Sequence, residues 1–229
     1  MRSGEYEIEL LAPSATYAND GVKVTERIKL RKGEKITVVL GQRGKPTNYN
    51  CGSGGSFVTL ERRTGPILLL AAEGGGVSND DFGNGTIEEK AKGNDDVGKS
   101  GSQFFIENEP NNTFCAGAGF SSDPEVYDLH ENSEPPQCYY NGMKGGIGIY
   151  SGKIMYGGFG GGGALCQIPG QMLRHGAGGG YTGGSNRKRD NEKQVDGGGG
   201  GSYSKYQTAI FEHHKETFGK FVITFVSDS

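Results

Sequence analysis

The feature that most constrains this chain is a glycine-rich stretch from Gly157 to Gly201, which includes runs of three to five consecutive glycines. Glycine has no side chain to bury, and it loses more backbone entropy on ordering than any other residue. Such a stretch cannot build a conventional hydrophobic core. Only a few structures are therefore open to it.

A flexible linker is the commonest fate of glycine-rich tracts. Linkers, however, are Gly/Ser repeats, whereas these runs are separated by aromatic and aliphatic residues and by Cys166. Collagen is excluded because the strict Gly-X-Y period is absent. The ordered alternative is a bundle of extended, polyproline-II-type segments whose bare backbones approach closely and hydrogen-bond sideways. A run of four or five glycines would then span roughly 12–16 Å.

The sequence on either side of the glycine-rich stretch alternates between apolar and polar residues, as half-buried strands do. The alternating segments are 6–10, 22–30, 36–40, 209–211 and 221–225, and two further strand-like segments, 57–60 and 67–72, flank the Thr64-Gly65-Pro66 turn. We expect 22–30 and 36–40 to form one antiparallel hairpin, and 57–60 and 67–72 to form a second. No apolar period of 3.6 residues is present, so no long helix is expected.

These patterns predict a mainly β fold, an antiparallel β-sandwich closed by the two chain ends with the glycine-rich segment inserted into it. We expect one composite region, 1–229, with strands mainly in 5–72 and 203–226 and the insertion at roughly 73–202. Residues 116–137, rich in Ser, Asp, Glu and Pro, are expected to be an exposed excursion.

Composition and cysteine usage limit the setting in which the chain works. The net charge is −3 with both signs mixed, which does not indicate nucleic-acid binding. The longest apolar runs, 67–72 and 221–226, are far shorter than the ~20 residues that span a bilayer. No apolar leader follows Met1, so we expect these residues to be an excised piece of a larger secreted or receptor chain.

Four cysteines at wide spacings, without a CxxC pair, favour two disulfides and an oxidising compartment. The cysteines are Cys51, Cys115, Cys138 and Cys166. Two glycosylation sequons agree with this setting, and they begin at Asn84 and Asn111.

Residues 93–100 match the P-loop pattern G-x4-G-K-S. A P-loop needs a buried strand before it and a helix after it. The preceding residues 88–92 are too charged for a buried strand, and Gly101, Ser102 and Pro110 make a poor helix. We interpret the match as a false positive, and we expect no enzymatic activity and no cofactor.

The four histidines lack the spacing of metal ligands, so no metal site is expected. His213 and His214 are predicted to lie in a solvated turn beside Glu212 and Glu216. Neither His130 nor His175 has a spaced Ser or Cys partner that would suggest a catalytic triad. The cysteines are assigned to disulfides rather than to nucleophilic catalysis.

The mixed-charge run 186–193 lies between glycine tracts and is open to two interpretations. It is either a solvated connector or a recognition surface that a rigid glycine scaffold displays, since binding residues concentrate on such loops. By position, the candidate ligand contacts are Tyr181, Asp190 and Glu192.

The ordered series of motifs resembles the glycine-rich extracellular domain of the anaplastic lymphoma kinase and leukocyte tyrosine kinase receptors. The similarity covers nearly the whole chain, and the order of the motifs makes it specific. The matching segments are 32–36, 39–42, 54–58, 68–76, 98–100, 157–163 closing on Cys166, 178–184 and 219–223.

This resemblance implies a TNF-like β-sandwich that carries an inserted bundle of polyglycine helices. It also implies an extracellular region to which a small secreted cytokine-like protein binds, driving receptor dimerisation and activating a kinase located elsewhere. The family pattern places a disulfide between Cys138 and Cys166, which leaves Cys51 and Cys115 for the second. The basic residues 187–189 and the shorter glycine runs differ from vertebrate receptors and imply a divergent, invertebrate member.

The leading hypothesis is thus the ligand-recognition region of a receptor tyrosine kinase, in the ectodomain of a single-pass plasma-membrane receptor. The alternative is a secreted structural or adhesive glycine-rich protein, such as a matrix or phage-type adhesin, in which the glycine bundle itself is the functional surface.

Overall fold

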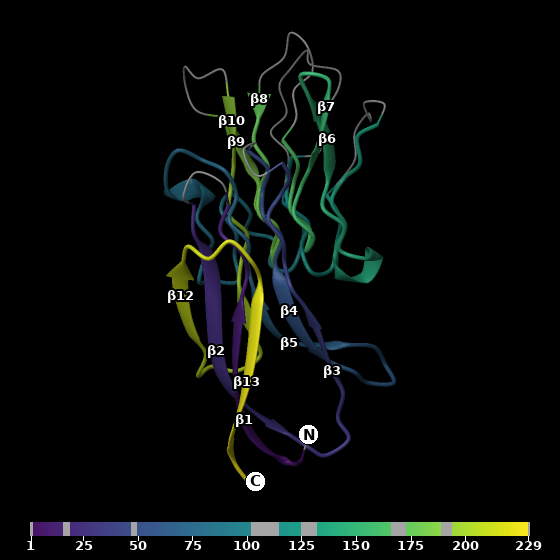
Figure 1. Ribbon diagram of the computed structural model, residues 1–229, viewed down its shortest axis with the longest axis vertical. Helices are drawn as coiled ribbons and strands as arrows, with labels where there is room; N and C mark the ends of the chain where they lie inside the picture. Colours follow the sequence, from purple (N-terminus) through teal and green to yellow (C-terminus); the bar gives the residue numbers. More distant parts are fainter. Residues whose placement is uncertain are drawn as a thin grey trace.

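The computed structural model describes residues 2–15, 19–46, 50–101, 115–124, 132–165, 173–188 and 194–228. The protein is mainly β, and its sheets are mostly antiparallel. Helical structure in the described residues is limited to two short 3-10 helices, η2 (Asp81–Gly83) and η3 (Tyr139–Asn141). The molecule is elongated, and both chain ends lie at the same end of its long axis (Figure 1).

The first large sheet joins strands from the two ends of the chain. Its order is β12 (Ile210–His214), β2 (Gly21–Leu30), β1 (Gly4–Leu11) and β13 (Lys220–Ser227). The predicted alternation in β1 is confirmed, because its apolar side chains are buried and the intervening glutamates are partly exposed. β1 and β13 pair directly in antiparallel register.

The second large sheet has the order β11 (Tyr203–Ser204), β5 (Ile67–Ala72), β4 (Ser56–Leu60) and β3 (Ile36–Val39). The predicted hairpin of 57–60 with 67–72 is confirmed, since β4 and β5 pair antiparallel. The predicted hairpin of 22–30 with 36–40 is wrong: β2 belongs to the first sheet, and β3 pairs with β4. The alternating pattern identified both strands. A strand with one solvent-exposed face can pair with any strand of similar pattern, so the pattern does not specify which strand lies beside it.

The two large sheets share one hydrophobic core. Each fully buried aliphatic side chain contributes about 1.5–3 kcal/mol to folding, and the cluster draws such residues from both sheets. From the first sheet come Ile8, Leu10, Val24 and Ile28, and from the second come Val58, Leu69, Leu70 and Ala72.

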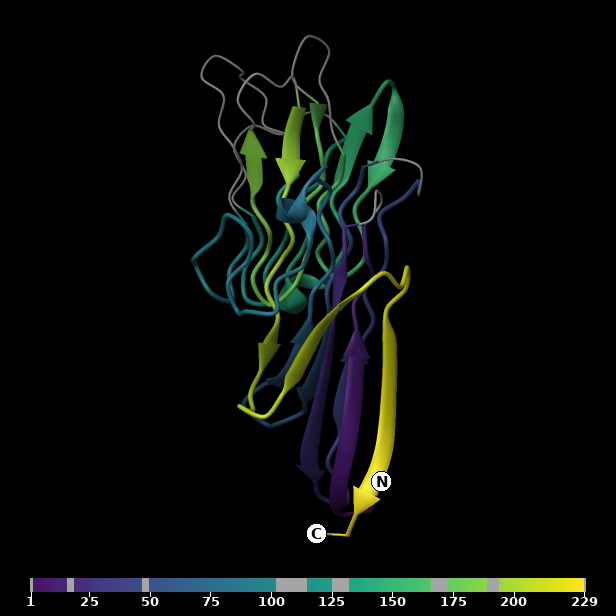
Figure 2. The same cartoon turned by 90° about the vertical axis from the view of Figure 1, so that its left-hand side faces the viewer.

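Smaller sheets occupy the end of the molecule opposite the chain ends (Figures 1 and 2). β6 (Ile147–Tyr150) and β7 (Lys153–Tyr156) form an antiparallel hairpin. β10 (Gln194–Gly197) pairs in parallel with β8 (Leu173–Arg174) and antiparallel with β9 (Asn186–Lys188). Glycine-containing segments connect these small sheets to the large ones.

The described glycine segments run so close together that side chains would not fit between them. Gly117 donates its N–H to the Gly184 carbonyl at 2.9 Å, and a Cβ on Gly117 would lie 1.9 Å from the carbonyl oxygen of Gly178. Gly178 in turn donates to Gly198 at 2.9 Å. These contacts make the described part of the stretch packed structure rather than a flexible linker. We refer to the hydrogen-bonded glycine segments as the glycine assembly.

The glycine assembly extends well beyond the stretch from Gly157 to Gly201. Gly54 contributes to it from a loop before β4, since a Cβ there would lie 1.8 Å from the Phe159 carbonyl oxygen. Residues 115–120 are buried, so the predicted exposed excursion over 116–137 is wrong for its first part. The small residues of 116–119 allow this segment to fit between other backbones. The polar residues that follow it made the whole segment resemble an exposed loop in the sequence.

Candidate functional site

The β9–β10 hairpin carries the segment that the sequence proposed for recognition. Asp196 of β10 lies opposite Arg187 of β9 in the antiparallel register. Asp190 and Glu192 lie outside the described residues, as does Arg189. The structure therefore describes the base of this hairpin.

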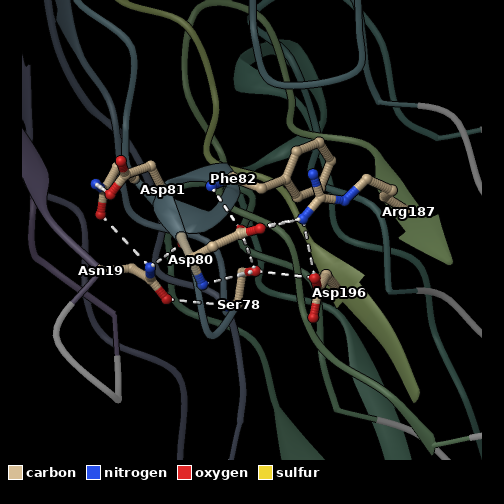
Figure 3. Close-up of polar contacts among 8 residues, drawn as sticks. Asn19, Ser78, Asp80, Asp81, Phe82, Arg187 and Asp196 are labelled. Carbon is tan, nitrogen blue, oxygen red and sulfur yellow. Dashed lines mark hydrogen bonds and ion pairs between the residues drawn. The ribbon is translucent and has the colours of Figure 1, made fainter. Parts of the chain in front are cut away.

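Arg187 ties the base of the hairpin to the η2 segment (Figure 3). Its Nη2 lies 3.0 and 2.8 Å from the two carboxylate oxygens of Asp80, and 3.2 Å from Asp196 Oδ2. The guanidinium carbon lies 4.0 Å from the centroid of the Phe82 ring. A planar guanidinium suits this combination of forked ion pairing and ring stacking better than the point charge of lysine would.

Two polar side chains complete this network (Figure 3). The Ser78 hydroxyl lies 2.8 Å from Asp80 Oδ1 and 2.9 Å from Asp196 Oδ2, within reach of both carboxylates. Asn19 Oδ1 accepts the Ser78 N–H at 2.9 Å, and Asn19 Nδ2 donates to the Asp80 carbonyl at 3.0 Å. We call Asn19, Ser78, Asp80, Phe82, Arg187 and Asp196 the Arg187 anchor.

Hydrogen bonds and the charge of Arg187 favour the ionised form of Asp80. Partial burial alone would raise the pKa of Asp80, but hydrogen bonds from Ser78, the Phe82 N–H and Arg187, with the charge of Arg187, hold this pKa well below its ordinary range. The Asp196 side chain is only 2% exposed and lies within ion-pair distance of Arg187. A permanently ionised, internally paired carboxylate is a poor proton donor or acceptor near pH 7. The anchor therefore has the chemistry of a structural clamp.

Tyr181 takes no part in the Arg187 anchor. Its ring packs against that of Tyr203, with centroids 4.5 Å apart, and it is half-buried. Its N–H donates to Gly201 and its carbonyl accepts from Phe120. Burial, and then the neighbouring charge of Glu89, raises the pKa of the Tyr181 hydroxyl. The structure thus places Tyr181 against the glycine assembly, and its role in ligand contact stays a prediction.

The cysteines do not form the bridges that the resemblance implied. Cys51 and Cys138 are free and buried, whereas Cys115 is disulfide-bonded. Both expected pairs, Cys51 with Cys115 and Cys138 with Cys166, are therefore wrong; Cys166 itself lies outside the described residues.

Both free thiols are poorly reactive because they are protonated at neutral pH. Burial raises the pKa of Cys51 to about 11, and its sulfur accepts the Leu165 N–H at 3.4 Å. Burial, and then Asp123, also raises the pKa of Cys138.

The P-loop match at 93–100 uses its polar groups to attach itself to the glycine assembly. Gly98 donates its N–H to Thr182 Oγ1 at 2.8 Å. Asn94 Nδ2 donates to the carbonyls of Ser100 and Gly183 at 2.8 and 3.0 Å. The described residues 84–101 form turns and isolated bridges.

The remaining candidate residues are placed as follows. The Asn84 side chain is engaged at both ends, because Oδ1 accepts the Asp20 N–H at 2.9 Å and Nδ2 donates to Asp81 at 3.0 Å. Asn111 lies outside the described residues, as does His130. Glycosylation of either sequon stays a prediction.

The expected turn at the adjacent histidines is wrong, since both belong to β12. His213 is exposed, whereas His214 is half-buried and accepts the Glu216 N–H at 3.0 Å. Burial lowers the pKa of His214. His175 is buried, and its Nε2 lies 3.0 Å from Asn50 Nδ2. No cluster of three His, Cys, Asp or Glu side chains suited to a metal ion occurs in the part of the chain that the structure describes.

Sequence reasoning missed most of the Arg187 anchor. Asp80 and Arg187 are 107 positions apart, so no local pattern links them. The available signal was the series Asn79-Asp80-Asp81-Phe82-Gly83, because aspartate commonly caps a short helical turn. The Phe82 N–H does donate to Asp80 Oδ1, at 2.9 Å.

Comparisons with known protein families and with curated proteins find no match to this chain. Among the described residues, no helix has the length and apolar character needed to cross a membrane.

Proposed function

We propose that this chain is the extracellular ligand-recognition region of a receptor tyrosine kinase similar to the anaplastic lymphoma kinase and leukocyte tyrosine kinase receptors. In this proposal a small secreted cytokine-like protein binds the region and promotes receptor dimerisation. The kinase lies outside these residues, and the region itself needs no cofactor. The sequons at Asn84 and Asn111 would carry glycans in this setting.

The proposal includes a finer description of the fold. The two large sheets, which share one core, would form a TNF-like β-sandwich. The glycine segments would be polyglycine helices of the polyproline-II type, packed in a bundle. Their close backbone contacts and inter-segment hydrogen bonds support this description, since only bare backbones can approach to such distances.

The observation that carries the functional proposal is the rigid seating of the β9–β10 hairpin. Arg187 clamps it to the η2 segment through Asp80 and Asp196, and β10 continues directly into the glycine assembly at Gly197. A binding loop held on a rigid scaffold loses less conformational entropy when it meets its ligand. This supports the recognition interpretation of the run 186–193 over that of a solvated connector.

The alternative of a structural or adhesive protein would require the glycine segments to be the contact surface. The described glycines at 176–180, 183–184 and 197–201 are all buried. Such residues are available only to the rest of the fold. This burial is the observation that counts against the adhesive alternative.

Binding tests the proposal directly. The whole chain is immobilised, and a panel of the cytokine-like ligands that activate receptors of this family is passed over it. We expect Glu192→Gln and Asp190→Asn to weaken ligand binding by more than about 1 kcal/mol each, as interface hot spots do. Tyr181→Phe removes only a hydroxyl and keeps the packing on Tyr203, so a loss of binding in this variant would assign a contact to that hydroxyl. Lys144→Gln, at an exposed position outside the proposed surface, is the matched control.

The Arg187 anchor makes a second, separable prediction. Arg187→Ala removes the ion pairs of Arg187 with Asp80 and with the buried Asp196, so we expect a loss of about 1–3 kcal/mol in unfolding free energy together with weaker ligand binding. Light scattering of the ligand complex should show two copies of the chain. Absence of binding across the panel, or unchanged affinity in both acidic variants, would remove the proposal.

A further inference from the structure

A groove lies at the end of the two large sheets that is near the chain ends. Its volume is about 510 Å³, within the range of ligand sites. Leu30 from β2, Leu60 from β4 and Leu69 from β5 line it, and all three are buried. Leu30 is paired with Gly4 of β1, which fixes the groove beside the N-terminal strand. The groove thus has an apolar floor.

The rim of the groove is cationic. Four basic side chains and one carboxylate line it, and they are Lys29, Arg31, Arg62, Lys205 and Glu34. Glu34 is already used: it pairs with Arg62 at 2.7 Å and accepts the Arg31 N–H at 2.9 Å. Those two contacts lower its pKa. In the described residues, no carboxylate lies within ion-pair distance of Arg31 or Lys205.

The local charge contrasts with that of the chain as a whole. The net charge is −3, which does not indicate an anion-binding site. The rim gathers its cations from the end of β2 and the turn after it, the turn after β4 and the segment after β11, which are far apart in the chain. The rim therefore has a local positive potential that the net charge of the whole chain does not reveal.

The groove also borders an open strand edge. β12 pairs with β2 only over Gly21–Thr25, and beyond Thr25 no described strand covers that side of β2. The segment that leads from β11 to β12 approaches this edge, because Thr208 Oγ1 donates to Glu26 at 2.8 Å. The Arg27 N–H at this edge is already bonded to Glu26 Oε1 at 2.8 Å, so only the part of the edge beyond Arg27 can pair its backbone with an extended peptide.

We propose that this groove binds an acidic peptide segment that carries one aromatic or large aliphatic side chain. The apolar side chain would occupy the leucine floor, the carboxylates would meet Arg31 and Lys205, and the backbone would lie along β2. A purely sulfated polysaccharide has no group for the floor, and an uncharged apolar ligand leaves the cations unused. The groove is near the chain ends, apart from the β9–β10 hairpin, and its occupation does not depend on the proposed function.

The test uses the whole chain and three capped, fluorescently labelled peptides in anisotropy titrations. The probe is EDFDE. The first control, QNFNQ, keeps the shape and removes the charge; the second, EDSDE, keeps the charge and removes the apolar anchor. We expect both controls to bind at least about tenfold more weakly than the probe, a difference of about 1.4 kcal/mol. Affinity should also fall as salt is raised, because exposed ion pairs are screened.

Charge reversal locates the site. We expect Arg31→Glu combined with Lys205→Glu to lower the affinity for EDFDE by roughly tenfold, the sum expected from several exposed pairs. The matched control is Lys144→Glu combined with Lys215→Glu, which makes the same charge change at exposed positions elsewhere. Circular dichroism melts establish that both variants fold.

Each contrary outcome overturns the proposal. Equal binding of QNFNQ removes the role of charge, and equal loss in both double variants removes the location. If EDSDE or a sulfated polysaccharide binds as tightly as EDFDE, the groove is a general anion site and the peptide assignment is wrong. If EDFDE does not bind with a Kd of about 1 mM or tighter, the proposal is also refuted. Arg187→Ala is expected to leave peptide affinity unchanged, which separates this test from that of the receptor proposal.

Discussion

Replacing Gly117 by alanine should unfold or severely weaken the glycine assembly. The added Cβ would lie 1.9 Å from the Gly178 carbonyl oxygen and 2.7 Å from its carbon, whereas ordinary contacts begin near 3.4 Å. Both neighbours are backbone, so relief requires a whole segment to move by more than an ångström. That movement would break the hydrogen bonds that join Gly117 to Gly184 and to Gly101, both 2.9 Å long.

The expected magnitude follows from these two effects. Overpacking costs typically 1–3 kcal/mol, and each buried backbone group left without a partner costs about 1–3 kcal/mol. With two hydrogen bonds broken and one group left without a partner at each, we expect a loss of about 3–9 kcal/mol in unfolding free energy. This approaches the total stability of many domains.

The matched control is Gly33→Ala in the turn after β2. Nothing lies within 4 Å of a Cβ at that position, but its φ of +88° makes alanine strained. Left-handed backbone costs a non-glycine residue about 1–2 kcal/mol. Urea unfolding followed by circular dichroism suits a chain without tryptophan. If Gly117→Ala costs no more than Gly33→Ala, close backbone packing is not what holds the assembly together.

Two further predictions concern buried titratable groups. Burial raises the pKa of Glu73 well above its ordinary value, against the opposing effects of the Thr86 N–H and Lys92. The contribution of this group to the unfolding free energy is therefore fully present at about pH 4, and it is lost as the pH rises toward the folded-state pKa. Glu73→Gln should remove that loss and be more stable than the wild type by at least about 1 kcal/mol at about pH 8, whereas parallel stability curves would contradict the assignment. In non-reducing peptide mapping, Cys51 and Cys138 should be alkylated only after unfolding and Cys115 only after reduction; a bridge at Cys51 would refute the cysteine state described above.

Strand positions could be predicted because alternation is a local property. β1 follows it and buries its apolar face, and β13, which also alternates, pairs with β1. β4 and β5 are predominantly apolar, and the turn between them indicated their antiparallel pairing. Partners could not be predicted where the chain crosses from one sheet to the other, as it does between β2 and β3. A strand with one solvent-exposed face fits either sheet equally well, and only packing in the shared core decides to which sheet it belongs.

The glycine assembly shows a different limit. Long glycine runs indicated an unusual structure, but isolated glycines such as Gly52 and Gly117 make equally tight contacts. A single glycine in a polar segment is indistinguishable from a turn residue. The Arg187 anchor was hidden for a related reason, since its members are brought together by backbone packing and not by any spacing in the chain.

Backbone packing also sets the register with which the hairpin joins the glycine assembly. Side-chain packing tolerates small slips, because apolar contacts are non-directional. Hydrogen bonds between bare backbones are directional, and they fix register as well as distance. Gly197 donates to Val77 at 2.9 Å and Gly198 to Ser185 at 2.8 Å, so β10 enters the assembly with its register already set. Movement of the hairpin would have to break these bonds and the Arg187 anchor together, and this coupling makes its base a suitable platform for recognition.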